Sequence, residues 1–204
     1  MSLELYLAYL VACILIAIIP GPTVALVVAN SLTHGMRAGL LNVAGTQLAL
    51  AVMMGILVVG LASIVETMGV WFDWIRLLGA AYLVWLGWKL LRSSGVIEAG
   101  GATPRPRGGF FLQGFLVMLS NPKVLIFFGA FIPQFVSPDG DQAGQIALLG
   151  VTAMAVALVS DSVYAVLTGR ARALFSRRRV RLMSQVSGAT LIGGGVWLAF
   201  TRSR

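Results

Sequence analysis

Residues 18–26 read IIPGPTVAL and lie deep inside an apolar run that extends over residues 5–28. Pro20 and Pro22 each remove a backbone N–H donor, and each ring crowds the carbonyl one turn back. Gly21, between them, adds no side chain and no stiffness. The sequence therefore predicts a helix that is broken near its middle.

A second interruption, Asn121-Pro122-Lys123, lies inside the apolar run 110–132, so that one break falls in each half of the chain. Broken helices at matching positions of two halves are typical of secondary transporters, because the carbonyls and amides freed at a break can bind polar solutes near the middle of the membrane. The alternative is a purely structural kink, since proline and glycine are common in membrane helices.

The composition indicates an integral membrane protein. Of the 204 residues, 58% are hydrophobic and 11% are charged, with a mean hydropathy of +0.91. A soluble domain carries roughly 25% charged residues. A single cysteine excludes a disulfide within the chain, and a single histidine without an HExxH motif leaves little for zinc, so no metal site and no cofactor are expected. No GxxxxGK[ST] motif is present, so we expect no ATP hydrolysis.

Six apolar runs approach the roughly 17–25 residues that a transmembrane helix needs. They cover residues 5–28, 40–64, about 75–91, 110–132, 146–167 and 182–200. We therefore predict an all-α membrane protein with six transmembrane helices in one domain, residues 1–204. A polar segment at 95–108 is expected to be a cytoplasmic linker between the halves 1–94 and 109–204. Three spans per half would insert the second half upside down relative to the first.

The charges predict the orientation. Eleven of the fifteen lysine and arginine residues lie between the first and second, third and fourth, or fifth and sixth runs, and five of the seven acids lie on the other side. Because an excess of lysine and arginine marks the cytoplasm, we expect both termini in the periplasm of a bacterial inner membrane. The basic cluster at 177–181 is interpreted as an anchor that fixes the topology, with a nucleic-acid or anionic-lipid patch as the alternative.

Two ionisable residues, Lys123 and Asp161, lie well inside the apolar runs. A charge at the bilayer centre costs at least ~2.5–3.5 kcal/mol on insertion scales, so it normally faces the interior and has a partner. We expect the two residues to pair, or to share substrate and proton, with Lys123 attracting a carboxylate and Asp161 meeting an ammonium group or carrying the coupling proton. A static pair that only orders the helices is the alternative. Tyr164 shares a stripe with Asp161, and Gln47 is a candidate hydrogen-bonding group for a substrate or for another helix.

Several ordered motifs resemble the LysE/RhtB family of bacterial amino-acid exporters. They are Pro20-Gly21-Pro22, the stretch 30–39 (NSLTHGMRAG), the stretch 79–89 (GAAYLVWLGWK), Gly114-Phe115-Leu116, Asn121-Pro122-Lys123 and Pro133-Gln134-Phe135. The resemblance implies six spans and proton-driven export of amino acids such as lysine, arginine, homoserine, threonine or leucine. It also implies functional roles for the two proline motifs. Thr23 stands where relatives often have a polar amide, which leaves the substrate open.

The sequence thus predicts a secondary transporter, not an enzyme, that exports amino acids or small zwitterions by proton antiport and alternating access. Its expected site comprises Pro20, Gly21, Pro22, Gln47, Asn121, Pro122, Lys123, Asp161 and Tyr164. The alternatives are efflux of another small solute or cation, or a membrane accessory subunit without transport. Small-residue faces are compatible with a homodimer but do not require one.

Overall fold

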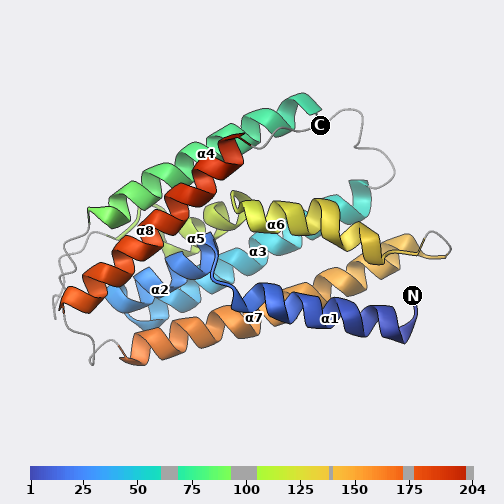
Figure 1. The fold of residues 1–204 in the computed structure, drawn as a ribbon, viewed down its shortest axis with the longest axis horizontal. Helices are drawn as coiled ribbons and strands as arrows, with labels where there is room; N and C mark the ends of the chain where they lie inside the picture. The colour runs from blue at the N-terminus through green and yellow to red at the C-terminus, as the bar shows by residue number, and fades with distance from the viewer. Residues whose placement is uncertain (61–68, 93–104, 138–139, 172–176, 201–204) are drawn as a thin grey trace.

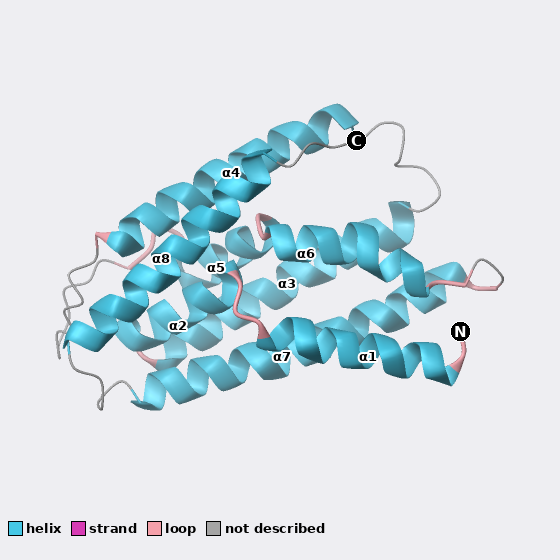
Figure 2. Cartoon of the chain, viewed as in Figure 1, coloured by secondary structure: helices cyan, strands magenta, loops and turns pink. Residues whose placement is uncertain are grey.

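The computed structural model describes residues 1–60, 69–92, 105–137, 140–171 and 177–200. Within these residues every regular element is a helix (Figure 2), which confirms the predicted all-α class. The elements are α1 (Leu3–Ile18), α2 (Pro22–His34), α3 (Met36–Gly60), α4 (Gly69–Leu91), α5 (Gly109–Leu119), α6 (Pro122–Ile126), the π-helix η1 (Phe127–Phe131), the 3₁₀-helix η2 (Ile132–Phe135), α7 (Gln142–Ala171) and α8 (Arg177–Phe200).

The helices pack side by side in one bundle (Figure 1). α4 lies against α8, and α3 lies against both α5 and α7. Contacts at glycines give the directions: Met36 at the start of α3 touches Gly169 near the end of α7, whereas Met54 touches Gly150. The helices α3 and α7 are therefore antiparallel.

Two glycines bring α3 and α5 into backbone contact. A Cβ at Gly45 would lie 2.0 Å from the carbonyl oxygen of Phe111, and a Cβ at Gly114 would lie 2.3 Å from that of Asn42. Both positions exclude any side chain. Such close packing through small residues is typical of helices in membranes.

The two runs predicted to contain broken helices are divided at the expected positions. α1 ends at Ile18 and α2 begins at Pro22, and the two helices are bent by 48°. α5 ends at Leu119 and α6 begins at Pro122. Beyond α6 the chain continues as a π-helix and a 3₁₀-helix, which the sequence did not lead us to expect. Hydropathy is similar for all three helical types, so it does not distinguish them.

Several helices extend beyond the apolar runs that predicted them. α3 begins four residues earlier than expected, and α7 is longer at both ends. The start of α7 is fixed by Asp141, whose Oδ1 accepts a hydrogen bond from the Gly144 N–H at 2.9 Å. Polar end turns of this kind are stabilised by caps and do not register in hydropathy.

Most of the predicted linker 95–108 lies outside the described residues.

The outer surface of the bundle is apolar. Val11, Leu15, Val151 and Val159 are each more than half exposed, as are other large apolar residues. Soluble proteins rarely expose such continuous apolar surface, whereas a lipid bilayer accommodates it. By length and composition, two described helices can cross a membrane, Met36–Val58 and Gln142–Ala171, and the bent pair α1–α2 is a third. Leu77–Leu91 and Gly109–Leu119 are apolar but shorter, so the six-span arrangement stays a prediction.

Candidate functional site

The break between α1 and α2 leaves the last carbonyls of α1 without helical partners. In an unbroken helix, the Ile16 carbonyl would accept a hydrogen bond from residue 20 and the Ile18 carbonyl from residue 22. Both residues are prolines, which have no N–H. These oxygens therefore need side chains, water or a solute as donors.

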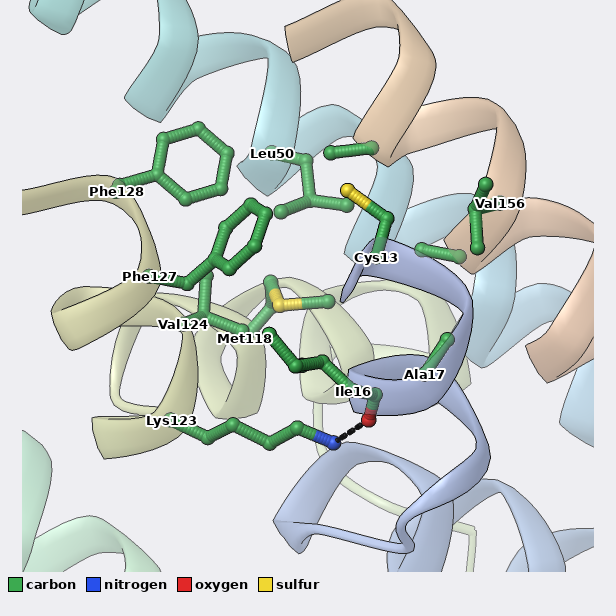
Figure 3. Close-up of a pocket in the computed structure, with 12 residues that line it drawn as sticks. Cys13, Ile16, Ala17, Leu50, Met118, Lys123, Val124, Phe127, Phe128 and Val156 are labelled. Carbon is green, nitrogen blue, oxygen red and sulfur yellow. Dashed lines mark hydrogen bonds between the residues drawn. The ribbon is translucent and has the colours of Figure 1, made fainter. Parts of the chain in front are cut away.

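The Lys123 ammonium group binds this carbonyl end. Its Nζ donates hydrogen bonds to the carbonyl oxygens of Ile16 and Ile19, the second at 2.6 Å, and Figure 3 shows the contact with Ile16. A cation is also favoured here because the C-terminus of a helix carries a partial negative charge. Lys123 therefore acts as a tethered cation at the end of α1, where the helix is interrupted.

Two side chains of α7 complete the cap on α1. The Tyr164 hydroxyl donates to the carbonyl of Ile18 at 3.1 Å, and the Ser160 hydroxyl donates to that of Ala17 at 3.4 Å. Both contacts join residues more than 140 positions apart. The freed end of α1 is therefore held by groups from the second half of the chain, on two separate helices.

The second break is joined to the first by a hydrogen bond between side chains. Asn121 caps α6, since its Oδ1 accepts from the Lys123 backbone N–H at 3.1 Å. Its Nδ2 donates to the Thr23 hydroxyl at 2.7 Å, and both side chains are buried. The Asn121 side chain therefore links the first turn of α2 to the first turn of α6.

Gly194 of α8 packs against the prolines of both breaks. A Cβ at Gly194 would lie 3.0 Å from Pro22 Cγ and 3.7 Å from Pro122 Cγ. At the neighbouring Gly193, a Cβ would meet nothing within 4 Å. The two helix starts thus converge on one point of α8, and we call this region, with Lys123 and the end of α1, the junction.

A cavity of about 80 Å³ lies beside the junction (Figure 3). Its walls come from α1, α3, α5, α6, η1 and α7. Apolar side chains dominate the lining, among them Leu50, Met118, Phe127 and Val156. The residues labelled in Figure 3 are Cys13, Ile16, Ala17, Leu50, Met118, Lys123, Val124, Phe127, Phe128 and Val156.

An aromatic cluster packs next to this cavity, on the side of the α1 N-terminus. The Tyr9 ring lies 6.0 Å from the ring centre of Phe127, 6.2 Å from that of Phe131 and 5.2 Å from that of Phe135. The Tyr9 hydroxyl is satisfied by the Leu149 carbonyl at 2.9 Å. Tyr9 is one helical turn before Cys13, and both Cys13 and Phe127 line the cavity, so the cluster adjoins the cavity on the N-terminal side of α1.

Asp161 is buried in α7, one turn after Ala157, which lines the cavity. Its charge interacts with that of Lys123, but the Lys123 ammonium hydrogen-bonds to the α1 carbonyls. Among the described residues, no hydrogen bond joins the two side chains. The structure therefore shows two opposite charges in one region without a direct contact, and their functional roles stay a prediction.

Gln47 lies on α3, and its Nε2 atom is buried without a hydrogen-bond partner. The antiparallel crossing of α3 and α7 places Gln47 within about one turn of the level of Asp161. An unpaired buried amide costs free energy, so the group is available to a polar ligand. Gln47 does not line the cavity.

The structure thus brings most of the predicted site residues together. The junction contains Pro20, Gly21, Pro22, Asn121, Pro122, Lys123 and Tyr164. Asp161 lies near this group, and Gln47 lies across from it on α3. Only Lys123 of the predicted residues also lines the cavity.

A buried amide network, which was not predicted from the sequence, lies among these helices. Asn30 Nδ2 donates to Asn42 Oδ1 at 2.7 Å and to Gln113 Oε1 at 2.9 Å, and Asn42 Nδ2 donates to the Phe110 carbonyl at 2.6 Å. The network fastens α2 and α3 to α5. Amides inside two apolar runs and just beyond a third were a usable signal, because polar groups in membrane helices hydrogen-bond to one another.

Comparisons with known proteins indicate the family of the chain. The model of the family described as LysE type translocator matches residues 14–202. The homoserine/homoserine lactone efflux protein of Salmonella typhimurium is 31% identical over 204 residues, 99% of each chain. The leucine efflux protein of Klebsiella pneumoniae is 29% identical over 203 residues, 97% of this chain and 96% of its own. An uncharacterized membrane protein of Vibrio cholerae is 28% identical over the full length of both chains. No solved structure gives a significant match.

Proposed function

The chain belongs to the LysE type translocator family, and we propose that it is a secondary transporter, not an enzyme, that exports an amino acid or a related small zwitterion. Relatives named for the efflux of homoserine and of leucine support this substrate class. The observation that carries the proposal is the junction, where Lys123 binds the carbonyl end of α1 beside a cavity.

The junction offers complementary groups for both charges of a zwitterion. A carboxylate suits the Lys123 ammonium and the free amides in the first turn of α2. An ammonium group suits the α1 carbonyls that Lys123 now occupies, with the Asp161 carboxylate close by. A substrate carboxylate that draws Lys123 away would thus release carbonyl oxygens for the substrate ammonium group. Both ends of the amino acid would be bound without an unpaired charge.

The helix contacts support a single domain of two inverted halves, 1–94 and 109–204. Corresponding spans of the halves pack against each other: the first against the fourth through α2 and α5, the second against the fifth through α3 and α7, and the third against the sixth through α4 and α8. This pattern is expected when a pseudo-two-fold axis relates the halves, and Gly194 lies between the first prolines of α2 and α6. In our proposal, these halves and the broken helices make up six transmembrane spans.

Alternating access requires the cavity to open to each side in turn. On the side of the α1 N-terminus, the packed rings of Tyr9, Phe127, Phe131 and Phe135 block the path. Release on that side would therefore need α1 to separate from η1 and η2. We assign this side to the periplasm, because basic residues gather at the other end of the bundle.

The basic end supports cytoplasmic placement of the loops and periplasmic placement of both termini. Lys89 and Arg92 finish α4, Arg170 lies in the last turn of α7, and α8 begins with basic residues. These ends gather on one side of the bundle, away from the N-terminus (Figure 1). An excess of positive charge there fits the cytoplasmic face of a bacterial inner membrane. Lipid contacts the exposed apolar surface, and the helix faces are compatible with a homodimer.

Proton coupling is assigned to Asp161. The ionised form of a buried carboxylate is stable only near a positive charge. When Lys123 turns to a substrate carboxylate, the substrate ammonium group takes its place near Asp161 and keeps the carboxylate ionised. A proton on Asp161 removes the negative charge that the substrate ammonium group needs, so substrate and proton would bind in alternation.

The test uses everted membrane vesicles and a panel of labelled amino acids. With an acidic lumen, we expect accumulation of at least one amino acid, and its loss when a protonophore collapses the gradient. Asp161→Asn should abolish gradient-driven accumulation but keep substrate exchange at equal pH. Asp141→Asn, at an exposed carboxylate, is the matched control and should keep both. The proposal fails if no amino acid moves, and the assignment of Asp161 fails if Asp161→Asn retains gradient-driven accumulation.

A further inference from the structure

We propose that the cavity beside the junction receives the side chain of the transported amino acid, and that it selects apolar side chains of leucine or methionine size. This inference rests on the proposed function, because it takes the amino-acid backbone to be held at the junction. It goes further because the relatives include both homoserine and leucine efflux proteins, and the inference favours a leucine-like substrate over a homoserine-like one.

The chemistry of the lining favours an apolar side chain. Of the twelve lining residues, only Lys123 and Cys13 carry a side-chain N–H or S–H donor, and a thiol is a weak donor. In the proposed bound state the Lys123 ammonium, which leaves the carbonyls of Ile16 and Ile19, is engaged by the substrate carboxylate and not by the side chain. A homoserine hydroxyl that enters this cavity would therefore lose its hydrogen bonds to water and gain no good replacement partner, which is unfavourable.

The position of Lys123 links the cavity to the junction. Its stem borders the cavity, while its ammonium group reaches the end of α1 at the rim, as Figure 3 shows. An amino acid held there by its two charged groups has its side chain next to the apolar walls. Leu50, Met118, Val124, Phe127, Phe128 and Val156 supply those walls from five different elements.

The same arrangement disfavours charged side chains. A lysine or arginine substrate would bring a second cation close to Lys123, into surroundings with no acidic lining residue. The only cation near a glutamate side chain would be the Lys123 ammonium group, which already binds the substrate α-carboxylate in this proposal. In both cases a charged group would lose its hydration without gaining a dedicated partner. The free-energy cost of that loss is far larger than the gain from burying a methyl group.

Substrate preference is measured with purified protein in liposomes, by exchange of labelled leucine, methionine, alanine, homoserine and lysine. We expect kcat/KM for leucine and methionine to exceed that for homoserine by about tenfold or more, the discrimination that an apolar pocket typically achieves. Lysine exchange should be lower still. Exchange of homoserine or lysine in preference to leucine would overturn the inference but leave the proposed export function standing.

Ala157→Leu tests the location of the side-chain site. Ala157 lines the cavity, whereas Ala155 of the same helix is exposed on the outside, so Ala155→Leu is a control with the same chemical change. The cavity variant should lower kcat/KM for leucine at least tenfold and spare the smaller substrate alanine. Retained alanine exchange also shows that the variant is folded. Equal leucine exchange by Ala157→Leu and Ala155→Leu would overturn the inference.

Val156→Thr tests the chemistry of the wall without a large change in volume. The added hydroxyl gives a homoserine side chain a partner, so the homoserine-to-leucine ratio of kcat/KM should rise by about fivefold, the effect of one hydrogen bond. Val159→Thr, on the exposed surface of α7, should leave the ratio unchanged. An unchanged ratio in Val156→Thr would also count against the cavity as the side-chain site. No exchange of any amino acid by the parent protein would instead refute the proposed function itself.

Discussion

Replacement of Lys123 by methionine would remove the ammonium group that caps α1 but keep an apolar side chain of similar length. The carbonyl of Ile16, in a partly buried bond, would lose its donor, and a hydrogen bond to a charged group contributes about 1.5–3 kcal/mol. The bond to the Ile19 carbonyl is exposed, so water replaces it at a cost of about 0–1 kcal/mol. Loss of the positive charge also leaves Asp161 without its charged neighbour.

One effect opposes these losses. A partly buried ammonium group has itself lost hydration, and its removal returns about 1 kcal/mol or more of that cost. We therefore expect Lys123→Met to lower the free energy of unfolding by about 2 kcal/mol, within the range typical of a broken buried hydrogen bond. The double variant Lys123→Met/Asp161→Asn should recover part of the loss, because it also removes the unpaired carboxylate.

Stability can be measured by reversible unfolding in mixed micelles, with denaturing detergent as the titrant and helix content as the signal. Lys89→Met is the matched control, since Lys89 is exposed and lies 5.5 Å above the Trp85 ring. We expect this control to change the unfolding free energy by less than about 0.5 kcal/mol, as for other surface substitutions. The reasoning is refuted if Lys123→Met unfolds like the parent protein, or if both variants are destabilised equally.

Three further predictions concern the contacts around the junction and can use the same unfolding assay. In a double-mutant cycle, Asn121→Ala and Thr23→Ala should show a coupling energy of about 0.5–1.5 kcal/mol, as their buried hydrogen bond requires, and additive effects would contradict the bridge. Gly194→Val should push Pro22 and Pro122 apart and cost about 1–3 kcal/mol, whereas Gly193→Val should cost about 1 kcal/mol or less; equal losses would argue against close packing at Gly194. Asn42→Ala should cost about 2–4 kcal/mol because it leaves two buried partners unpaired, and a loss below about 1 kcal/mol would show that the amide network is weak.

The sequence predicted the features that follow from backbone chemistry. Pro20 and Pro22 cannot donate hydrogen bonds, so an interruption of the helix was expected at this point, and the structure has it. Asn121-Pro122 is a helix start by the same reasoning, because Asn caps and Pro fits the first turn. A lysine in mid-span needed polar partners, and Lys123 has them.

The identity of those partners was beyond sequence reasoning. Lys123 was expected to pair with Asp161 or to share substrate and proton with it; in the structure its ammonium hydrogen-bonds to carbonyls of α1, which the sequence did not indicate. Hydropathy patterns give the position of a charge along a helix, but not the rotation of that helix about its axis. Ser160 was missed for the same reason, since a hydroxyl in an apolar helix usually bonds to its own backbone and carries no sign of a distant acceptor.

The cavity could not have been predicted either. Its lining combines six elements, and residues such as Phe127 and Val156 are indistinguishable in sequence from ordinary core residues. The π-helix η1, which contributes Phe127 and Phe128, also leaves no mark in hydropathy. Tertiary packing alone decides which apolar residues surround a space.

The most direct test of the account uses Cys13, the only cysteine of the chain, which lines the cavity. In proteoliposomes, the rate at which a small membrane-permeant thiol reagent modifies Cys13 is measured with and without amino acids. We expect leucine, at concentrations that saturate exchange, to slow the modification about threefold or more, as mass action requires of a site that the ligand occupies. Lysine should not slow it. In Cys13→Ala/Ala143→Cys, where the thiol lies at an exposed helix end, neither amino acid should have an effect. An identical rate of Cys13 modification with and without leucine would contradict the claim that this cavity, beside the meeting point of the two broken helices, holds the substrate.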